Sequence, residues 1–240
     1  MLRKITQEHK KSACFLVKLF SLCVIILLGA LLGYFSEWLE YGIYYSEHPL
    51  LNYHNDILVF AGTMLNNLGC WIFFASLIAY FSWTPFNAGV NTLSFFLAMC
   101  IAYFIPKHLH FGYSVRYQLL FWVGIAIVSS LAAVLIWYSK VGGLFGILIK
   151  SLPISAILSE GAYIIIFNRL RYYRPISTSL THFINWLLPT EWALMLAAYI
   201  AFAIVLIICF GKHAKDRLWI TCTSVCATAL LLSILIALYS

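Results

Sequence analysis

The sequence predicts an all-α fold, a polytopic transmembrane bundle of about seven helices, on the strength of three observations. Hydrophobic residues make up 63% of the 240 residues, and the mean hydropathy is +0.93. Charged residues make up 10%, whereas a soluble domain carries about a quarter. The few charges stand between apolar stretches of roughly twenty residues, the length that crosses a bilayer. We therefore expect a single transmembrane domain, residues 1–240, in a bacterial cell membrane.

The first four predicted spans cover residues 14–35, 57–81, 86–105 and 117–138. The first follows a basic N-terminus, as a signal sequence would, but no small-residue cleavage site follows it, so we expect it to be retained. The second ends before Pro85 and the third at Pro106, because proline lacks the amide hydrogen that a helix interior needs. Lys140 and the two glycines after Val141 end the fourth span.

The last three predicted spans cover residues 141–167, 190–210 and 218–239. Lys150 and Pro153 interrupt the first of these, which leaves two interpretations open. One is a kinked helix whose lysine reaches the interface along its aliphatic stem; the other is a discontinuous helix that lines a cavity. The basic loop 168–175 favours a re-entrant hairpin, because it resembles a cytoplasmic sequence. The other basic residues place the N-terminus in the cytoplasm.

The most informative single residue is Glu160, because a carboxylate inside an apolar helix is costly unless it is paired, protonated or hydrated. It lies roughly 10 Å from the predicted outer end of its span, a depth comparable to that of Asn66 and Asn67. The spacing places Thr63, Asn67 and Cys70 on one helix face. The predicted ligand-binding residues are Glu160, Asn66, Asn67, Thr63, Tyr163 and Lys150. The alternative is that these groups only form hydrogen bonds between helices.

Two glycine pairs predict close packing of helices. Gly29 and Gly33 form a GxxxG pattern in the first span, and Gly142 and Gly146 form another in the fifth. Such pairs let helix backbones approach each other. The contacts are either internal, or made with a second copy or another membrane protein.

Two loops on the predicted outer side raise the question of a metal or pH-sensing site. They contain Glu40, Glu47, His48, His54, Asp56, His108 and His110. The spacing matches no metal-binding motif, so we predict no metal and no cofactor. The neighbouring aromatic residues favour a segment at the headgroup boundary that caps a pocket.

Two classes of function are disfavoured by the sequence. No HExxH, GxSxG or paired acidic motif is present, so no enzyme is predicted. The net charge of +7 comes from basic residues at the ends of apolar segments, which topology explains better than nucleic-acid binding does. The expected partner is the lipid bilayer.

Two stretches, Asn66–Met99 and Ser151–Gly161, resemble an uncharacterised family of bacterial multispanning membrane proteins. That resemblance implies a class and no activity. In outline the chain is also similar to the S subunits of energy-coupling-factor transporters. Those subunits are helix bundles with a long first outer loop over an outward pocket, and small residues on their first helix meet a transport partner. Gly29 and Gly33 would correspond to such residues.

Two functional hypotheses follow. In the first, the protein binds or helps to transport a small solute or ion through a polar pocket in the outer half of the bundle. In the second, it is a non-enzymatic membrane partner, of a structural or immunity type, that acts through helix contacts. The first requires Glu160, and the second tolerates its replacement.

Overall fold

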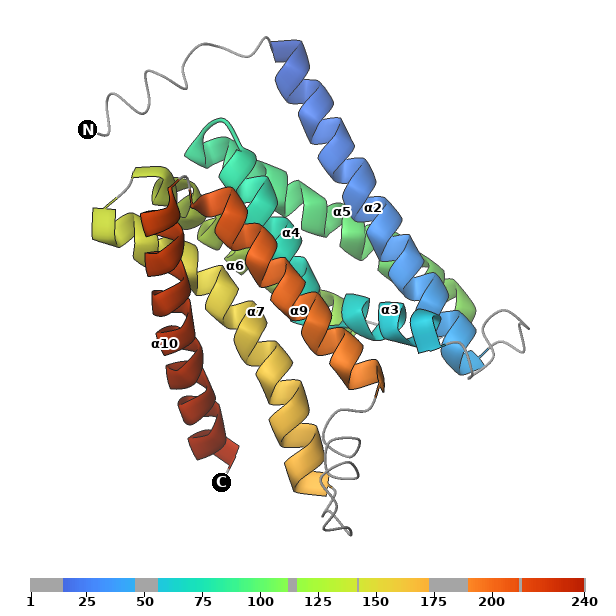
Figure 1. Ribbon diagram of the computed structural model, residues 1–240. Coiled ribbons are helices and arrows are strands. Elements are labelled where there is room, and N and C mark those ends of the chain that lie inside the picture. The colour runs from blue at the N-terminus through green and yellow to red at the C-terminus, as the bar shows by residue number, and fades with distance from the viewer. Residues whose placement is uncertain are drawn as a thin grey trace. The chain divides into compact units, whose positions relative to one another are not determined.

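The computed structural model describes residues 15–45, 56–111, 116–141, 143–172, 190–211 and 213–239, and within them it contains helices and no strand. The prediction of an all-α fold is thereby confirmed for this part of the chain. The helices are α2 (Phe15–Tyr45), α3 (Asp56–Asn66), α4 (Leu68–Phe81), α5 (Pro85–Phe111), α6 (Arg116–Tyr138), the short 3-10 helix η2 (Ser139–Val141), α7 (Gly143–Tyr172), α9 (Thr190–Phe210) and α10 (Ala214–Tyr239) (Figure 1).

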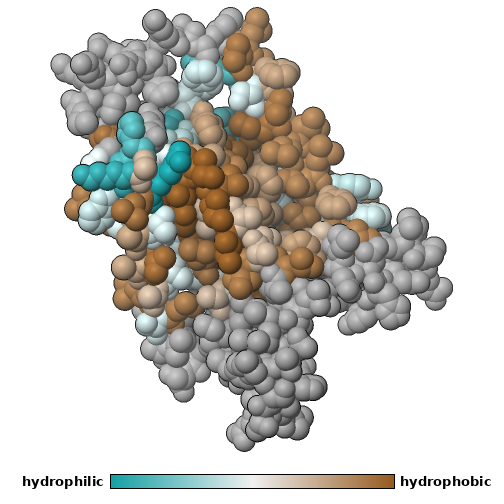
Figure 2. Space-filling view, in the orientation of Figure 1, coloured by the Kyte–Doolittle hydropathy of each residue, from teal (hydrophilic) through white to brown (hydrophobic). Residues whose placement is uncertain are grey.

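Several of these helices have the length and composition to cross a membrane. They are Leu16–Tyr41, Pro85–His110, Tyr117–Val141 and Gly143–Ile164, with α3 and α4 together as a fifth, bent candidate. Large apolar side chains point outward from them: Phe20 is 71% exposed and Phe121 is 62% exposed. Hydrophobic residues cover most of the described surface that Figure 2 presents. Such surfaces are stable against lipid, and they indicate a membrane location.

The helix break lies elsewhere than the sequence suggested. The segment 57–81, predicted as one span, is two helices, α3 and α4, bent by 65° at Asn67. In contrast, α7 continues through Pro153 to Tyr172, so the discontinuous or re-entrant helix considered there is wrong. One proline removes one backbone hydrogen bond, which a long helix tolerates. The segment Asn66-Asn67-Leu68-Gly69 combines three poor helix formers, which compete with or loosen the helical backbone.

The described helices group into two compact units. The first holds α2, α3, α5, α6, η2, residues 74–81 of α4 and residues 143–149 of α7. The second holds residues 67–73, the rest of α7, α9 and α10. The expectation of one transmembrane domain for the whole chain stays a prediction.

In the first unit, α2 and α5 run parallel and pack closely (Figure 1). A Cβ atom at Gly29 would lie 2.4 Å from the Phe95 carbonyl oxygen, and one at Gly33 would lie 2.4 Å from that of Met99. This glycine pair therefore packs within the chain. Gly146 lies instead against its own preceding turn, with its Cβ position 2.8 Å from the Ser139 oxygen, and Gly142 is outside the described residues.

The turn between α4 and α5 is fixed by side-chain hydrogen bonds. Thr84 caps α5, since its Oγ1 accepts the Asn87 amide at 3.0 Å, and Pro85 fills the first helical position. At the end of α4 the Ser82 carbonyl accepts hydrogen bonds from Trp137 Nε1 and Lys140 Nζ, both at 2.9 Å. These bonds hold one end of α4 to the α6–η2 corner.

The second unit is held by contacts between its helices. Phe73 of α4 stacks on Phe202 of α9, with ring centroids 4.3 Å apart. The Thr228 hydroxyl of α10 donates to the Ser224 carbonyl of its own helix at 2.8 Å and lies 3.5 Å from the Ser155 carbonyl oxygen of α7. Arg217 Nε donates to the Gly211 carbonyl at 2.9 Å, which satisfies an acceptor beyond the end of α9. The first turns of α4 thus pack among helices from the C-terminal half of the chain.

Replacing Gly33 by Ala should destabilise the protein by about 1–3 kcal/mol, because the new methyl group would overlap the Met99 carbonyl oxygen. A backbone oxygen cannot move away by a change of rotamer, as a side chain could. The matched control is Gly124→Ala, since nothing lies within 4 Å of a Cβ atom there. We expect the control to be neutral or stabilising, by up to about 1 kcal/mol from helix propensity. Thermal unfolding in detergent measures both. Equal behaviour of the two variants would contradict the close α2–α5 contact.

Candidate functional site

The predicted residue Glu160 lies on α7, next to the start of α4. Its Oε1 accepts a hydrogen bond from the backbone amide of Leu68, the first residue of α4, at 2.9 Å. The amide of Gly69 lies beside the same carboxyl group. The first amides of a helix have no partner within the helix, and its N-terminus carries partial positive charge. Glu160 therefore caps the helix that begins at the break.

Tyr199 of α9 completes this site. Its side chain is fully buried, with one ring edge against Gly69 and the other against Gly161. A Cβ atom at Gly69 would lie 2.2 Å from Tyr199 Cε1 and 2.5 Å from Glu160 Oε2. One at Gly161 would lie 3.0 Å from Tyr199 Cδ2. The two glycines make the slot that the tyrosine ring fills.

Two oxygen atoms of this site are buried and unpaired. Among the described residues neither Glu160 Oε2 nor the Tyr199 hydroxyl meets full hydrogen-bond geometry with a partner, although the two groups lie close enough to each other for a side-chain hydrogen bond. Buried polar atoms without partners are uncommon, because their lost hydration is not replaced. Within the described residues no basic side chain pairs with Glu160. As far as the structure describes the chain, the site thus holds a carboxyl group without a counter-charge beside a buried tyrosine hydroxyl.

The other predicted ligand-binding residues lie in different places. Asn66 belongs to the first unit, where its Oδ1 accepts a hydrogen bond from Ser36 at 3.4 Å. Thr63 is also in the first unit and is exposed. Lys150 is buried, which is contrary to a side chain that reaches the interface. Tyr163 is half-buried, one turn beyond Glu160 on α7.

The shared helix face predicted for Thr63, Asn67 and Cys70 is wrong. That prediction assumed one continuous helix, and the 65° bend at Asn67 interrupts the periodicity. Cys70 is buried in the second unit, within electrostatic range of Glu160. Convergence of Asn66 and Thr63 with Glu160 stays a prediction. The sequence reasoning also missed Tyr199 and Gly69; the signal for Gly69 was its place just after two asparagines.

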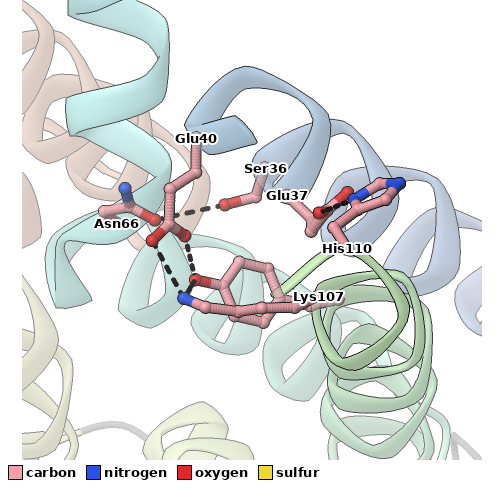
Figure 3. A network of polar contacts seen from close by, with 7 residues as sticks. Ser36, Glu37, Glu40, Asn66, Lys107 and His110 are labelled. Atoms are coloured by element: carbon pink, nitrogen blue, oxygen red, sulfur yellow. Dashed lines mark hydrogen bonds and ion pairs between the residues drawn. The ribbon is translucent and has the colours of Figure 1, made fainter. Parts of the chain in front are cut away.

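A second polar cluster joins the ends of α2 and α5 in the first unit (Figure 3). Lys107 Nζ lies 2.9 Å from Glu40 Oε1 and 2.8 Å from the Tyr103 hydroxyl, which in turn donates to Glu40. Nearby, His110 Nδ1 lies 2.7 Å from Glu37 Oε1. These groups had been expected in loops, but α2 continues to Tyr45 and α5 to Phe111.

The polar side chains of this cluster contact one another. Glu37 is almost fully buried and faces His110, while the buried Lys107 is neutralised by Glu40. Among the described residues no three His, Cys, Asp or Glu side chains converge as metal ligands. Of the loop residues considered for a metal site, Glu47, His48 and His54 lie outside the described ranges. The cluster acts as a structural clamp between two helices.

No family model, curated protein or solved structure matches this chain. The two resemblances drawn from the sequence therefore stay predictions.

Replacing Gly69 by Ala should destabilise the protein by about 1–3 kcal/mol, because the methyl group would overlap the ring of Tyr199, which is packed on both edges. Gly161→Ala should have a smaller effect, since its Cβ position is 3.0 Å from the ring. Thermal unfolding ranks the two variants. The opposite order would contradict the described position of the tyrosine.

Replacing Lys107 by Met should lower the free energy of unfolding by up to about 3 kcal/mol, because it leaves Glu40 without its counter-charge in a site where that side chain is only 21% exposed. The double variant Lys107→Met/Glu40→Gln should recover part of the loss, since no charge is then left without a partner. Lys215→Met is the control, because Lys215 is exposed. If Lys107→Met unfolds like the control, the clamp contributes nothing to stability.

Proposed function

We propose that this chain is a multi-pass membrane protein of about seven spans that binds, or helps to move, a small solute or ion at a site around Glu160. The spans would be α2, the bent pair α3–α4, α5, α6, α7, α9 and α10. The proposal includes a cytoplasmic N-terminus. The parallel packing of α2 and α5 supports counting α3–α4 as one span, since two helices separated by one further span must cross in the same direction.

The observation that carries this proposal is the pair of unsatisfied oxygens beside a helix break. Discontinuous helices within membranes bring helix termini and free backbone groups to a binding site. Here the N-terminus of α4 meets Glu160, while Oε2 and the Tyr199 hydroxyl remain available. A carboxyl group that only capped a helix would not need an unpaired hydroxyl beside it. In the proposed topology Glu160 lies in the outer half of the membrane.

The proposed role is binding rather than catalysis. A carboxyl, a phenol and a buried thiol at Cys70 surround the start of α4. Recognition of a solute or ion needs only the unpaired oxygens.

Thermal unfolding of the detergent-purified protein, with a panel of cations, vitamins and small metabolites, tests the proposal. A ligand that binds only the folded state stabilises it by about 2.7 kcal/mol at one hundred times its Kd. We expect at least one compound to raise the Tm of the wild-type protein and to have no effect on Glu160→Gln. Glutamine keeps an oxygen for the Leu68 amide, so the variant should fold.

The control variant is Asp216→Asn, which removes a carboxylate from the first turn of α10. It should respond to ligands as the wild type does. If no compound shifts any of the three proteins, or if Glu160→Gln responds normally, the solute hypothesis fails. A protein partner that acts through helix contacts then becomes the better hypothesis.

A further inference from the structure

We infer that Glu160 Oε2 and the Tyr199 hydroxyl form the binding site of a single exchangeable proton, which is the ion that this protein binds. The inference rests on the function proposed above and names its ligand. It starts from the two buried oxygens that lack partners. One O–H···O hydrogen bond between them would satisfy both atoms, and the pair needs only a small approach to form it.

The available space favours a proton over a metal ion. A Cβ atom at Gly69 would lie 2.5 Å from Glu160 Oε2 and 2.2 Å from the Tyr199 ring, so this side of the carboxyl group is already filled. A hard cation such as Ca²⁺ or Mg²⁺ takes about six or more oxygen ligands. The two unpaired oxygens offer far fewer. A proton requires one oxygen to carry it and one to accept its hydrogen bond.

The surroundings support both protonation states, which a proton carrier requires. When Glu160 is ionised, the Leu68 amide and the N-terminus of α4 stabilise the anion, and the Tyr199 hydroxyl can donate to Oε2. When a proton binds Oε2, the new O–H can donate to the tyrosine oxygen instead. The half-buried carboxyl, which no basic side chain neutralises within the described residues, then carries no charge.

The titratable groups that face Glu160 come from two neighbouring helices. Tyr199 stands on α9 and Cys70 on the first turns of α4. Neither is basic, so neither fixes the carboxylate as a permanent ion pair. This arrangement differs from the clamp in the first unit, where Lys107 holds Glu40 at 2.9 Å. The proton on Glu160 is therefore the exchangeable one.

Infrared spectroscopy of the full-length protein in lipid nanodiscs tests the inference, because a protonated carboxyl group has its own carbonyl stretching band. Because the chain has eight acidic residues, the band of Glu160 is the component of the wild-type spectrum that Glu160→Gln lacks. We expect that component to appear and disappear during a pH titration of the wild type. In Tyr199→Phe the band should shift in frequency, since the ring still fills its slot but the hydrogen-bond partner is gone. Asp216→Asn should leave the band unchanged.

The outcomes separate the two proposals. The proposed proton-binding site is refuted if Glu160→Gln keeps the titrating band, or if Tyr199→Phe does not shift the frequency of that band. A solute or metal cation could stabilise the wild type but not Glu160→Gln, while no Glu160 band titrates. That result would support the proposed binding function and contradict the proposal that the ligand is a proton. If the band titrates as expected and no compound shifts the Tm, the proton-binding site is supported and binding of a solute is contradicted.

Discussion

The site around Glu160 depends on one hydrogen bond, from the Leu68 amide to the Glu160 carboxyl group. A helix that starts inside an apolar medium leaves its first amides without water to bind, and each unsatisfied group costs several kcal/mol. The carboxyl of α7 provides the acceptor and pulls the start of α4 toward it. Gly69 and Gly161 follow from the same constraint, because at this short separation only glycine leaves room for the Tyr199 ring. The break, the acid, the ring and both glycines form one linked set.

The two polar clusters show how the same residue type acquires different roles. Glu40 has a lysine, a tyrosine hydroxyl and partial exposure, so its charge is balanced and its geometry is fixed. Glu160 has a backbone amide and a helix N-terminus, which supply partial positive charge but no mobile cation. A full counter-ion would lock the carboxylate, whereas a helix dipole stabilises it while leaving it free to take up a proton. The first arrangement suits a clamp and the second suits exchange.

The sequence was informative about helices and about Glu160, and much less so about what surrounds it. Apolar runs located α6, α9 and α10 closely, because helix length in a bilayer is set by thickness. The sequence identified Glu160 because a carboxylate inside an apolar segment is energetically costly unless it is paired, protonated or hydrated. The partner Tyr199 could not be found, since which helices pack together depends on long-range contacts that no local spacing encodes. The sequence did not predict the helix ends at Tyr45 and Phe111. Charged residues such as Glu40 and Lys107 are typical of loops between spans, and only the structure shows that these two form an ion pair between helices.

The position of the break also shows why proline is an uncertain guide in such chains. Pro153 leaves α7 continuous, since the rest of its helical hydrogen bonds persist around a single missing donor. At Asn67 no proline is present, but the asparagine side chains offer the backbone alternative hydrogen bonds, and Gly69 adds backbone freedom. Those local preferences alone would not fix the 65° bend. The Glu160 carboxyl group, ninety-two residues after Leu68 in the chain, accepts a hydrogen bond from the amide that the break exposes.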